Sequence, residues 1–96
     1  MKITELNPRW VGYDGLRLGV SFDCPHCIIQ RLLVPFHHKG FEHIEDFHIL
    51  PHTANGNIWS EVNPADDSFD NLSLIPSIDC SGSGHWHGFI TNGEVT

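Results

Sequence analysis

The chain has 96 residues, which is room for a single domain spanning residues 1–96, since single domains cluster at about 100–150 residues. Twelve Asp and Glu residues against five Lys and Arg residues give a net charge of −7, so the chain repels phosphate backbones and we expect no nucleic-acid partner. The sequence has neither the apolar run of a secretory signal nor an apolar stretch of membrane-spanning length. We therefore expect a cytoplasmic protein with no membrane partner.

Composition predicts a mainly β fold. The sequence has nine Gly and six Pro residues but only two Ala residues, and most of its apolar residues are β-branched or aromatic. We expect a small antiparallel β-sheet or sandwich. A chain this short buries only about 60–70% of its unfolded surface, so a bound metal ion or another cross-link would help to stabilise its fold.

The first predicted elements form a hairpin. In residues 16–22, Leu16, Leu18, Val20 and Phe22 alternate with small or polar residues, the period-two pattern of a half-buried strand. A second, more buried strand is expected over residues 32–34 and ends at Pro35. Residues 24–27, in the stretch "DCPHC", would then form the tip of the hairpin.

The rest of the chain predicts further short strands. The histidine-rich stretch 36–57 has mixed periodicity and predicts at most one short strand or helical turn around residues 47–50. Strands are expected over 57–62, 72–78 and 85–90, with a polar turn over 63–71. Asn92-Gly93 predicts a tight turn before a last extended segment.

Cysteine and histidine spacing predicts a zinc site. Cys24 and Cys27 have the C-x2-C spacing with which one tight turn presents two sulfurs to a single ion, at about 2.3 Å. The second half of a site is found in "DCSGSGHWHGF", where Cys80, His85 and His87 compete for two places. If His85 and His87 lie on a strand, they point to the same face. The sequence thus predicts a small β domain, either a sheet or sandwich or a zinc-ribbon-like fold, that one zinc ion pins together.

The role of such a zinc ion has two interpretations. Closed, thiolate-rich sites are usually structural, so two Cys ligands favour a structural zinc and no catalytic residue. The alternative is a small zinc hydrolase with an open metal position at His85 or His87. In that case Asp23 and Asp79 would orient the ligands or act as a base.

The same tetrapeptide also permits a third interpretation, a Cys24–Cys27 dithiol oxidoreductase. Cys-Pro-His-Cys occurs as the active-site sequence of oxidising thioredoxin-fold proteins, in which the motif opens a helix. The residues after Cys27 are poor helix formers, since two Ile residues follow it at once and Pro35 lies eight residues beyond it. The chain also lacks an alternating β-α pattern.

Other polar and aromatic residues have simpler interpretations. The remaining histidines of the middle segment follow no strict ligand spacing, and we expect solvated or hydrogen-bonded side chains rather than a second metal site. Asp66-Asp67 is expected to solvate or cap a turn. The three tryptophans are expected to pack in the core or at its rim. The residues concerned are His37, His38, His43, His48 and His52, and Trp10, Trp59 and Trp86.

The chain resembles a family of small bacterial and tailed-phage proteins of unknown function, some members of which have been mislabelled as ammonia monooxygenase. The resemblance rests on "FDCPHC", on Trp59 and on "LSLIPSIDCSGSGHWHGFITNGEV", and it covers residues 16–34 and 57–95. It implies a zinc-binding, mostly β domain in which Cys24 and Cys27 match the family's first ligand pair and His87 its final His. His85 falls where relatives have a Cys or His ligand, and Cys80 precedes that window as a fifth candidate.

Together, these features predict a small accessory protein of a phage or prophage that acts by binding a host or phage protein, with zinc as its scaffold. Its location would then be the host cytoplasm. The acidic surface and a long histidine-bearing loop on a rigid frame suit such a role.

Overall fold

The computed structural model describes residues 1–13, 16–36, 48–49 and 58–96, and this part of the chain is mainly β. Its strands are short, and its helical elements are three 3-10 turns of three or four residues: η1 (Ile3–Leu6), η2 (Phe69–Asn71) and η3 (Ser81–Ser83). No helix in these ranges is long and apolar enough to cross a membrane. The prediction of a mainly β fold is confirmed.

The larger sheet has the order β1-β2-β3-β4. Its strands are β1 (Arg9–Tyr13), β2 (Leu16–Asp23), β3 (Arg31–Pro35) and β4 (His48–Ile49). β1, β2 and β3 pair antiparallel, so the predicted hairpin is confirmed, whereas β4 runs parallel to β3. The strand β1 is an element that the sequence analysis did not predict.

The C-terminal part consists of three two-stranded ribbons. They are β5 (Ser60–Glu61) with β6 (Leu74–Ile75), β7 (Ile78–Asp79) with β8 (His87–Gly88), and β9 (Ile90–Thr91) with β10 (Glu94–Val95). The strands expected over 72–78 and 85–90 are each divided in two, and the one expected over 57–62 is reduced to two residues. Pro76 has no amide N–H to donate, which accounts for the break between β6 and β7.

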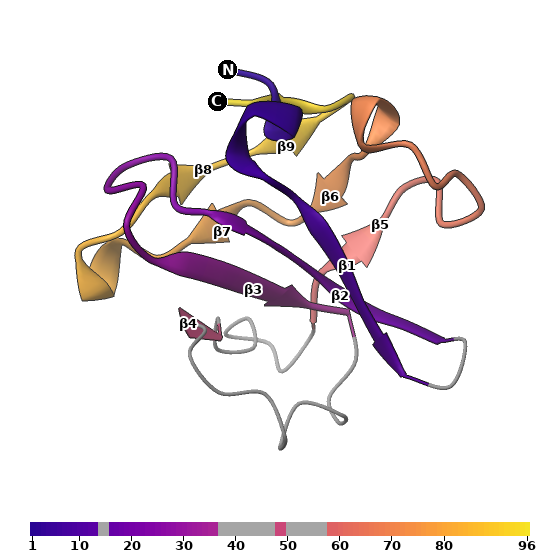
Figure 1. Ribbon diagram of the computed structural model, residues 1–96, viewed down its shortest axis with the longest axis horizontal. Helices are drawn as coiled ribbons and strands as arrows, with labels where there is room; N and C mark the ends of the chain where they lie inside the picture. The colour runs from indigo at the N-terminus through magenta and orange to yellow at the C-terminus, as the bar shows by residue number, and fades with distance from the viewer. Residues whose placement is uncertain (14–15, 37–47, 50–57) are drawn as a thin grey trace.

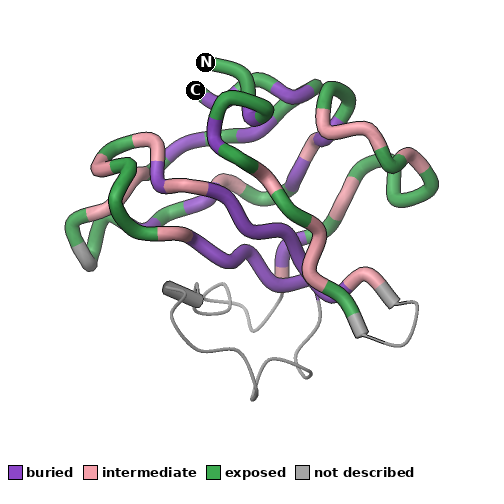
Figure 2. The backbone as a smooth tube through the Cα atoms, viewed as in Figure 1, coloured by how far each residue is buried: buried purple, intermediate pink, exposed green. Residues whose placement is uncertain are grey.

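The core lies between the sheet and these ribbons, and Figure 2 shows its buried residues concentrated along β2 and β3. Phe22, Leu32 and Val34 are buried in the sheet, and Ile78 and Ile90 are buried in the ribbons. Ser21 is also buried, so β2 is covered on both faces rather than on one as the alternation predicted.

The two ends of the chain lie side by side (Figure 1). The amide of Ile3 donates to the carbonyl of Gly93 at 2.8 Å, and the amide of Val95 donates to the carbonyl of Met1 at 2.7 Å. The turn between β9 and β10 has φ values of 48° at Asn92 and 76° at Gly93. The predicted Asn-Gly turn is therefore confirmed.

The first hairpin is also tied to the segment that follows β5. The Arg17 guanidinium lies 3.8 Å from the ring centroid of Trp10, donates to Glu61 at 2.6 Å and pairs with Asp67. Trp10 stacks on Phe69 with ring centroids 4.5 Å apart. Because the Arg17–Glu61 pair is mostly buried, removal of either side chain would leave the other charge buried without its partner, which is strongly destabilising.

We expect Gly93→Ala to lower the free energy of unfolding by about 1–3 kcal/mol, because Gly93 has positive φ and an added Cβ would lie 2.7 Å from the carbonyl oxygen of Asp70. Gly82→Ala is the matched control, since a Cβ there meets nothing within 4 Å. Urea denaturation of both variants measures the difference. Equal stability of the two variants would contradict the described turn.

Candidate metal centre

Cys24 and Cys27 lie in the turn that joins β2 to β3. The amide of Cys24 donates to the carbonyl of Gln30 at 2.9 Å, and the amide of Ile28 donates to the carbonyl of Cys24 at 2.8 Å. These bonds curl residues 24–30 into a compact turn that brings both cysteines to one side. Cys24 is fully buried and Cys27 is partly exposed.

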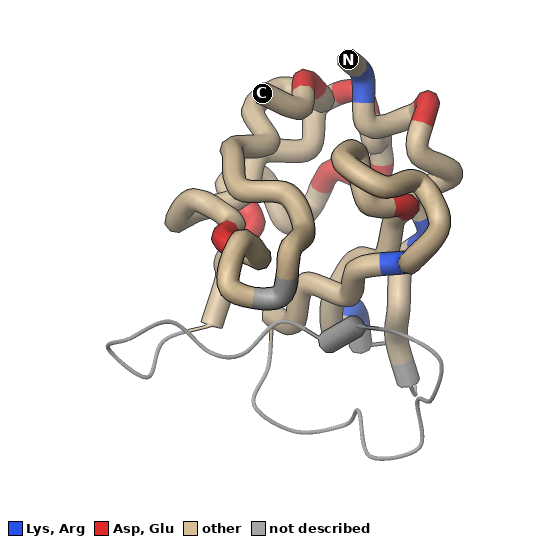
Figure 3. Tube along the Cα trace, turned by 90° about the vertical axis from the view of Figure 1, so that its left-hand side faces the viewer, with Lys and Arg blue, Asp and Glu red and all other residues tan. Residues whose placement is uncertain are grey.

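Cys80 and His85 lie in the turn that joins β7 to β8, at the same end of the molecule as the first turn (Figures 1 and 3). The amide of Cys80 donates to the carbonyl of Trp86 at 2.9 Å, and the amide of His85 donates to the carbonyl of Cys80 at 3.0 Å. Gly84 has a φ of 78°, which closes this turn.

The two turns share a pattern that the sequence analysis missed. Each begins with a buried apolar residue, an Asp and a buried Cys, namely Phe22-Asp23-Cys24 and Ile78-Asp79-Cys80. In each, the Cys amide bonds to the carbonyl six residues further along the chain. The repeated Asp-Cys step after an apolar residue was the available sequence signal. The molecule therefore presents two similar cysteine turns toward one another.

Three side chains from the two turns form a cluster that could hold a metal ion. The ligand atoms of Cys24, Cys27 and His85 all lie within 4.8 Å of one another, and Sγ of Cys27 is 3.6 Å from Nδ1 of His85. Tetrahedral zinc, with bonds of about 2.3 Å to sulfur and 2.0–2.1 Å to nitrogen, places a sulfur and a nitrogen ligand about 3.6 Å apart. The observed separation fits shared coordination of one ion.

The other two candidate ligands, Cys80 and His87, lie outside this cluster. Cys80 is only 3% exposed, and burial raises the pKa of its thiol to about 12, with the nearby charges of Cys24 and Asp79 adding to the effect. His87 is half exposed, and its Nδ1 lies 3.9 Å from a carboxylate oxygen of Asp79. β8 begins at His87, so His85 belongs to the turn and the expected shared strand face does not apply.

Backbone donors favour the thiolate of Cys27. The N–H groups of Gln30 and Ile29, with smaller contributions from Cys24 and His85, lower the pKa of the Cys27 thiol to about 7 against the opposing effect of burial. Asp79 is held by the hydroxyl and amide of Ser81 at 2.6 and 2.9 Å, which lowers the pKa of its carboxyl group. Asp79 thus stays ionised beside His87.

The helix that a thioredoxin-type dithiol would require does not follow the CPHC sequence. Residues 25–30 form turns and bends, and the chain then enters β3. All three cysteines are free thiols. Cys27 therefore owes its lowered pKa to two amides of a tight turn and not to a helix N-terminus.

The tip of the first turn carries two exposed isoleucines. Ile28 and Ile29 are 62% and 93% exposed, and Ile28 has a φ of 61°. The left-handed region costs a residue with a Cβ about 1–2 kcal/mol. The tip is therefore both strained and apolar.

The remaining polar candidates have structural partners. Asp66 accepts hydrogen bonds from the amide of Ser68 at 2.8 Å and from the side chain of Asn71 at 3.0 Å, which confirms its predicted role in a turn. Trp59 is buried, and Trp86 packs edge-on against Phe22 with ring centroids 6.1 Å apart. Of the middle histidines, His37, His38, His43 and His52 lie outside the described residues.

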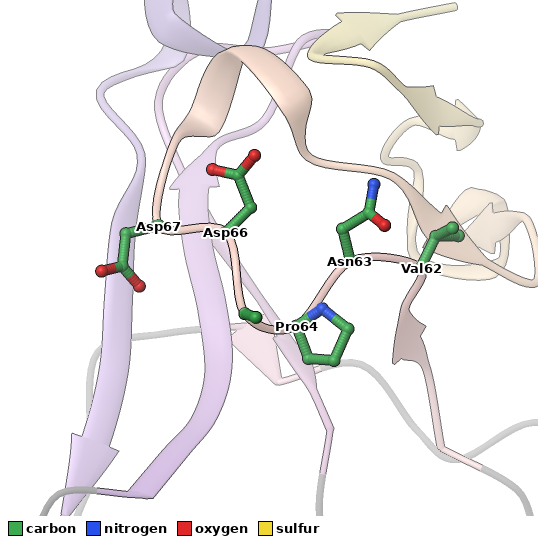
Figure 4. Close-up of a pocket in the computed structure, with 6 residues that line it drawn as sticks. Val62, Asn63, Pro64, Asp66 and Asp67 are labelled. Atoms are coloured by element: carbon green, nitrogen blue, oxygen red, sulfur yellow. The ribbon is translucent and has the colours of Figure 1, made fainter.

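A shallow hollow of about 590 Å³ lies in the segment after β5 (Figure 4). It is lined by Val62, Asn63, Pro64, Ala65, Asp66 and Asp67. The hollow is on the opposite side of the molecule from the two cysteine turns (Figure 1), and none of its residues belongs to the metal cluster.

Comparisons with known proteins identify no relative. No protein-family model matches the chain, and no curated protein or solved structure matches it.

We expect the metal-free protein to react with iodoacetamide faster at Cys27 than at Cys80. The thiolate is the reactive form, so the Cys27 rate should rise with pH up to its pKa of about 7 and then level off, whereas Cys80, with a pKa of about 12, should stay unmodified at pH 8. Peptide mass spectrometry over a pH series measures both rates. Faster labelling of Cys80 would contradict the described burial.

Proposed function

We propose that the protein is a structural zinc-binding domain that acts through protein–protein interaction. The observation that carries this proposal is the convergence of Cys24, Cys27 and His85 within 4.8 Å, although Cys27 and His85 are 58 residues apart in the sequence. A shared metal ion would compensate for the free-energy cost of bringing thiolate and imidazole side chains together in this way.

The donor set supports zinc as the metal. Two sulfurs and one imidazole nitrogen suit a borderline-soft ion with tetrahedral geometry, and they suit magnesium or calcium poorly. The amides of Gln30 and Ile29 that lower the pKa of Cys27 would continue to stabilise its thiolate in the bound state.

Cys80 is the fourth ligand in this proposal. It lies in the same turn as His85, and the charge of Cys24 contributes to its raised pKa, as expected for neighbouring sulfurs. Metal binding deprotonates a coordinating thiol, so the ion would displace the proton that burial keeps on the Cys80 thiol. His87 would instead remain with Asp79.

A closed site of three thiolates and one histidine has no position for a reactive water, so its role is structural. The hydrolase alternative requires Cys80 to stay uncoordinated. Because the hollow on the surface lies away from the cluster, a substrate there would not reach the ion.

The biological part of the proposal rests on the sequence resemblance of "FDCPHC", Trp59 and "LSLIPSIDCSGSGHWHGFITNGEV" to small bacterial and tailed-phage proteins. It assigns the chain to that family, as an accessory protein that binds a host or phage protein in the host cytoplasm. The net charge of −7 supports a protein partner over nucleic acid.

We expect protein purified without chelator or immobilised nickel to contain one zinc ion per chain. Removal with EDTA should lower the melting temperature and change the circular dichroism spectrum, because a structural zinc contributes about 10–16 kcal/mol of apparent binding energy to folding. Elemental analysis and thermal denaturation measure both effects. A metal-free protein with an unchanged fold would overturn the proposal.

We expect Cys80→Ser to remove about one third of the thiolate-to-metal charge-transfer absorption of the cobalt-substituted protein, because three thiolates become two. His87→Gln is the control and should leave the spectrum unchanged. Loss of tetrahedral cobalt features in His87→Gln, with no effect of Cys80→Ser, would instead identify His87 as the fourth ligand.

A further inference from the structure

The three cysteines of the two turns differ in their exposure to solvent. Cys24 is fully buried and Cys80 is 3% exposed, whereas Cys27 is partly exposed. Oxidation of cysteine follows thiolate character and solvent access, so a small oxidant that arrives through water meets the sulfur of Cys27 first. One of the three sulfurs is therefore open to oxidation, and the other two are protected from the solvent.

A second sulfur lies within reach of Cys27. The sulfurs of Cys24 and Cys27 are no more than 4.8 Å apart. The amide of Ile28 donates to the carbonyl of Cys24, so residues 24–28 form one turn. A turn keeps Cα atoms three residues apart within about 7 Å, and a disulfide joins Cα atoms about 4.4–6.8 Å apart. Rotation of the two side chains would therefore allow a disulfide to form without unfolding the turn.

We propose that Cys27 is a peroxide-sensitive oxidation site and that formation of a Cys24–Cys27 disulfide releases the metal ion. The inference rests on the proposed function, because the ion that leaves is the structural zinc. Oxidation removes two of the four proposed ligands at once. Cys80 and His85 remain, and two ligands do not complete a tetrahedral zinc site.

The reaction is a two-electron oxidation in which hydrogen peroxide is the oxidant. The Cys27 thiolate attacks one peroxide oxygen, the O–O bond breaks, and the products are a sulfenic acid and a hydroxide ion. The Cys24 thiolate then attacks the Cys27 sulfur, forms the S–S bond and displaces a second hydroxide ion. The two sulfurs together lose two electrons, which reduce the peroxide. The zinc ion leaves with its charge unchanged.

Cys24 is a better partner for Cys27 than Cys80 is. Cys24, Cys27 and His85 form the cluster whose ligand atoms all lie within 4.8 Å of one another, and Cys80 lies outside it. The two disulfides would also have opposite consequences. A Cys27–Cys80 bond would keep the two cysteine turns together, whereas a Cys24–Cys27 bond lies within one turn and frees the other from it.

Oxidation should loosen only one end of the molecule. The turn between β7 and β8 loses the metal ion that it shares with the turn between β2 and β3. The other side of the molecule has bonds of its own, such as those from Ile3 to Gly93 at 2.8 Å and from Arg17 to Glu61 at 2.6 Å. Segments with fewer stabilising contacts open at a lower free energy than the rest of a domain.

Zinc release together with peptide mapping tests the proposal. The zinc-loaded full chain is treated with hydrogen peroxide beside a colorimetric zinc indicator, and the remaining thiols are then blocked with iodoacetamide. Trypsin cleaves after Arg17 and Arg31, so Cys24 and Cys27 lie in one peptide and Cys80 lies in another. A disulfide within the first peptide is identified by mass spectrometry as the loss of two hydrogen atoms.

We expect one zinc ion to be released for each Cys24–Cys27 disulfide that forms, and zinc to bind again after reduction with dithiothreitol. Cys80→Ser should form the same disulfide as the wild-type chain. Retention of zinc after oxidation, a disulfide between the two peptides, or irreversible oxidation of Cys27 beside an alkylated Cys24 would overturn the proposal.

Amide hydrogen exchange provides a control within the chain. The amides of Cys80 and His85 should exchange at least about tenfold faster in the oxidised chain than in the zinc-loaded chain. The amides of Ile3 and Val95, which are bonded at the joined chain ends, should change by less than about twofold. Equal acceleration at all four amides would show general unfolding and contradict a local switch.

The zinc content before oxidation separates this inference from the proposed function. If the untreated chain contains no zinc, the proposed function fails. If the untreated chain contains one zinc ion that stays bound after peroxide treatment, only this inference fails.

Discussion

The meeting of two turns from opposite halves of the chain is the constraint on which the rest of the structure depends. One turn joins β2 to β3 and the other joins β7 to β8, and Cys27 and His85 approach to 3.6 Å. Each turn is closed by the same Cys amide bond to a carbonyl six residues on. The ribbons of the C-terminal part therefore pack against the first hairpin in the arrangement that brings Cys24, Cys27 and His85 within 4.8 Å of one another.

Packing and hydrogen bonding fix the opposite side of the molecule. The N-terminal 3-10 turn bonds to the β9–β10 hairpin, and the Arg17 network joins the first hairpin to Glu61 and Asp67. These contacts join distant parts of the chain without a metal ion. The core that they enclose is small, because the strands are short. A domain of this size has a net stability of about 5–15 kcal/mol at most, so an ion that binds only the folded state changes that stability substantially.

Local patterns predicted the elements that depend on local chemistry. The alternation in residues 16–22, the buried run at 32–34 and the Asn92-Gly93 turn were all predicted, because side-chain periodicity and turn residues act over a few positions. The strand β1 was missed, because Arg9–Tyr13 shows no alternation and is paired by β2 across a bulge between Val11 and Gly12. The spacing of the Cys and His residues indicated five candidate ligands but not which of them lie together in the fold. That depends on where β8 begins and on the contact between His87 and Asp79.

Ile28 is the place where local preference and tertiary structure disagree. Elsewhere in the described residues, each turn with positive φ uses Asn or Gly, so the sequence agrees with the backbone. At Ile28 the turn is imposed by the backbone hydrogen bonds that bring Cys24 and Cys27 together. The β-branched side chain is therefore held at a positive φ that is unfavourable for it. Such a conflict persists when the surrounding structure determines the backbone more strongly than the residue itself does. A turn closed by hydrogen bonds provides that determination, so Ile28 keeps a left-handed backbone while Ile28 and Ile29 both stay exposed.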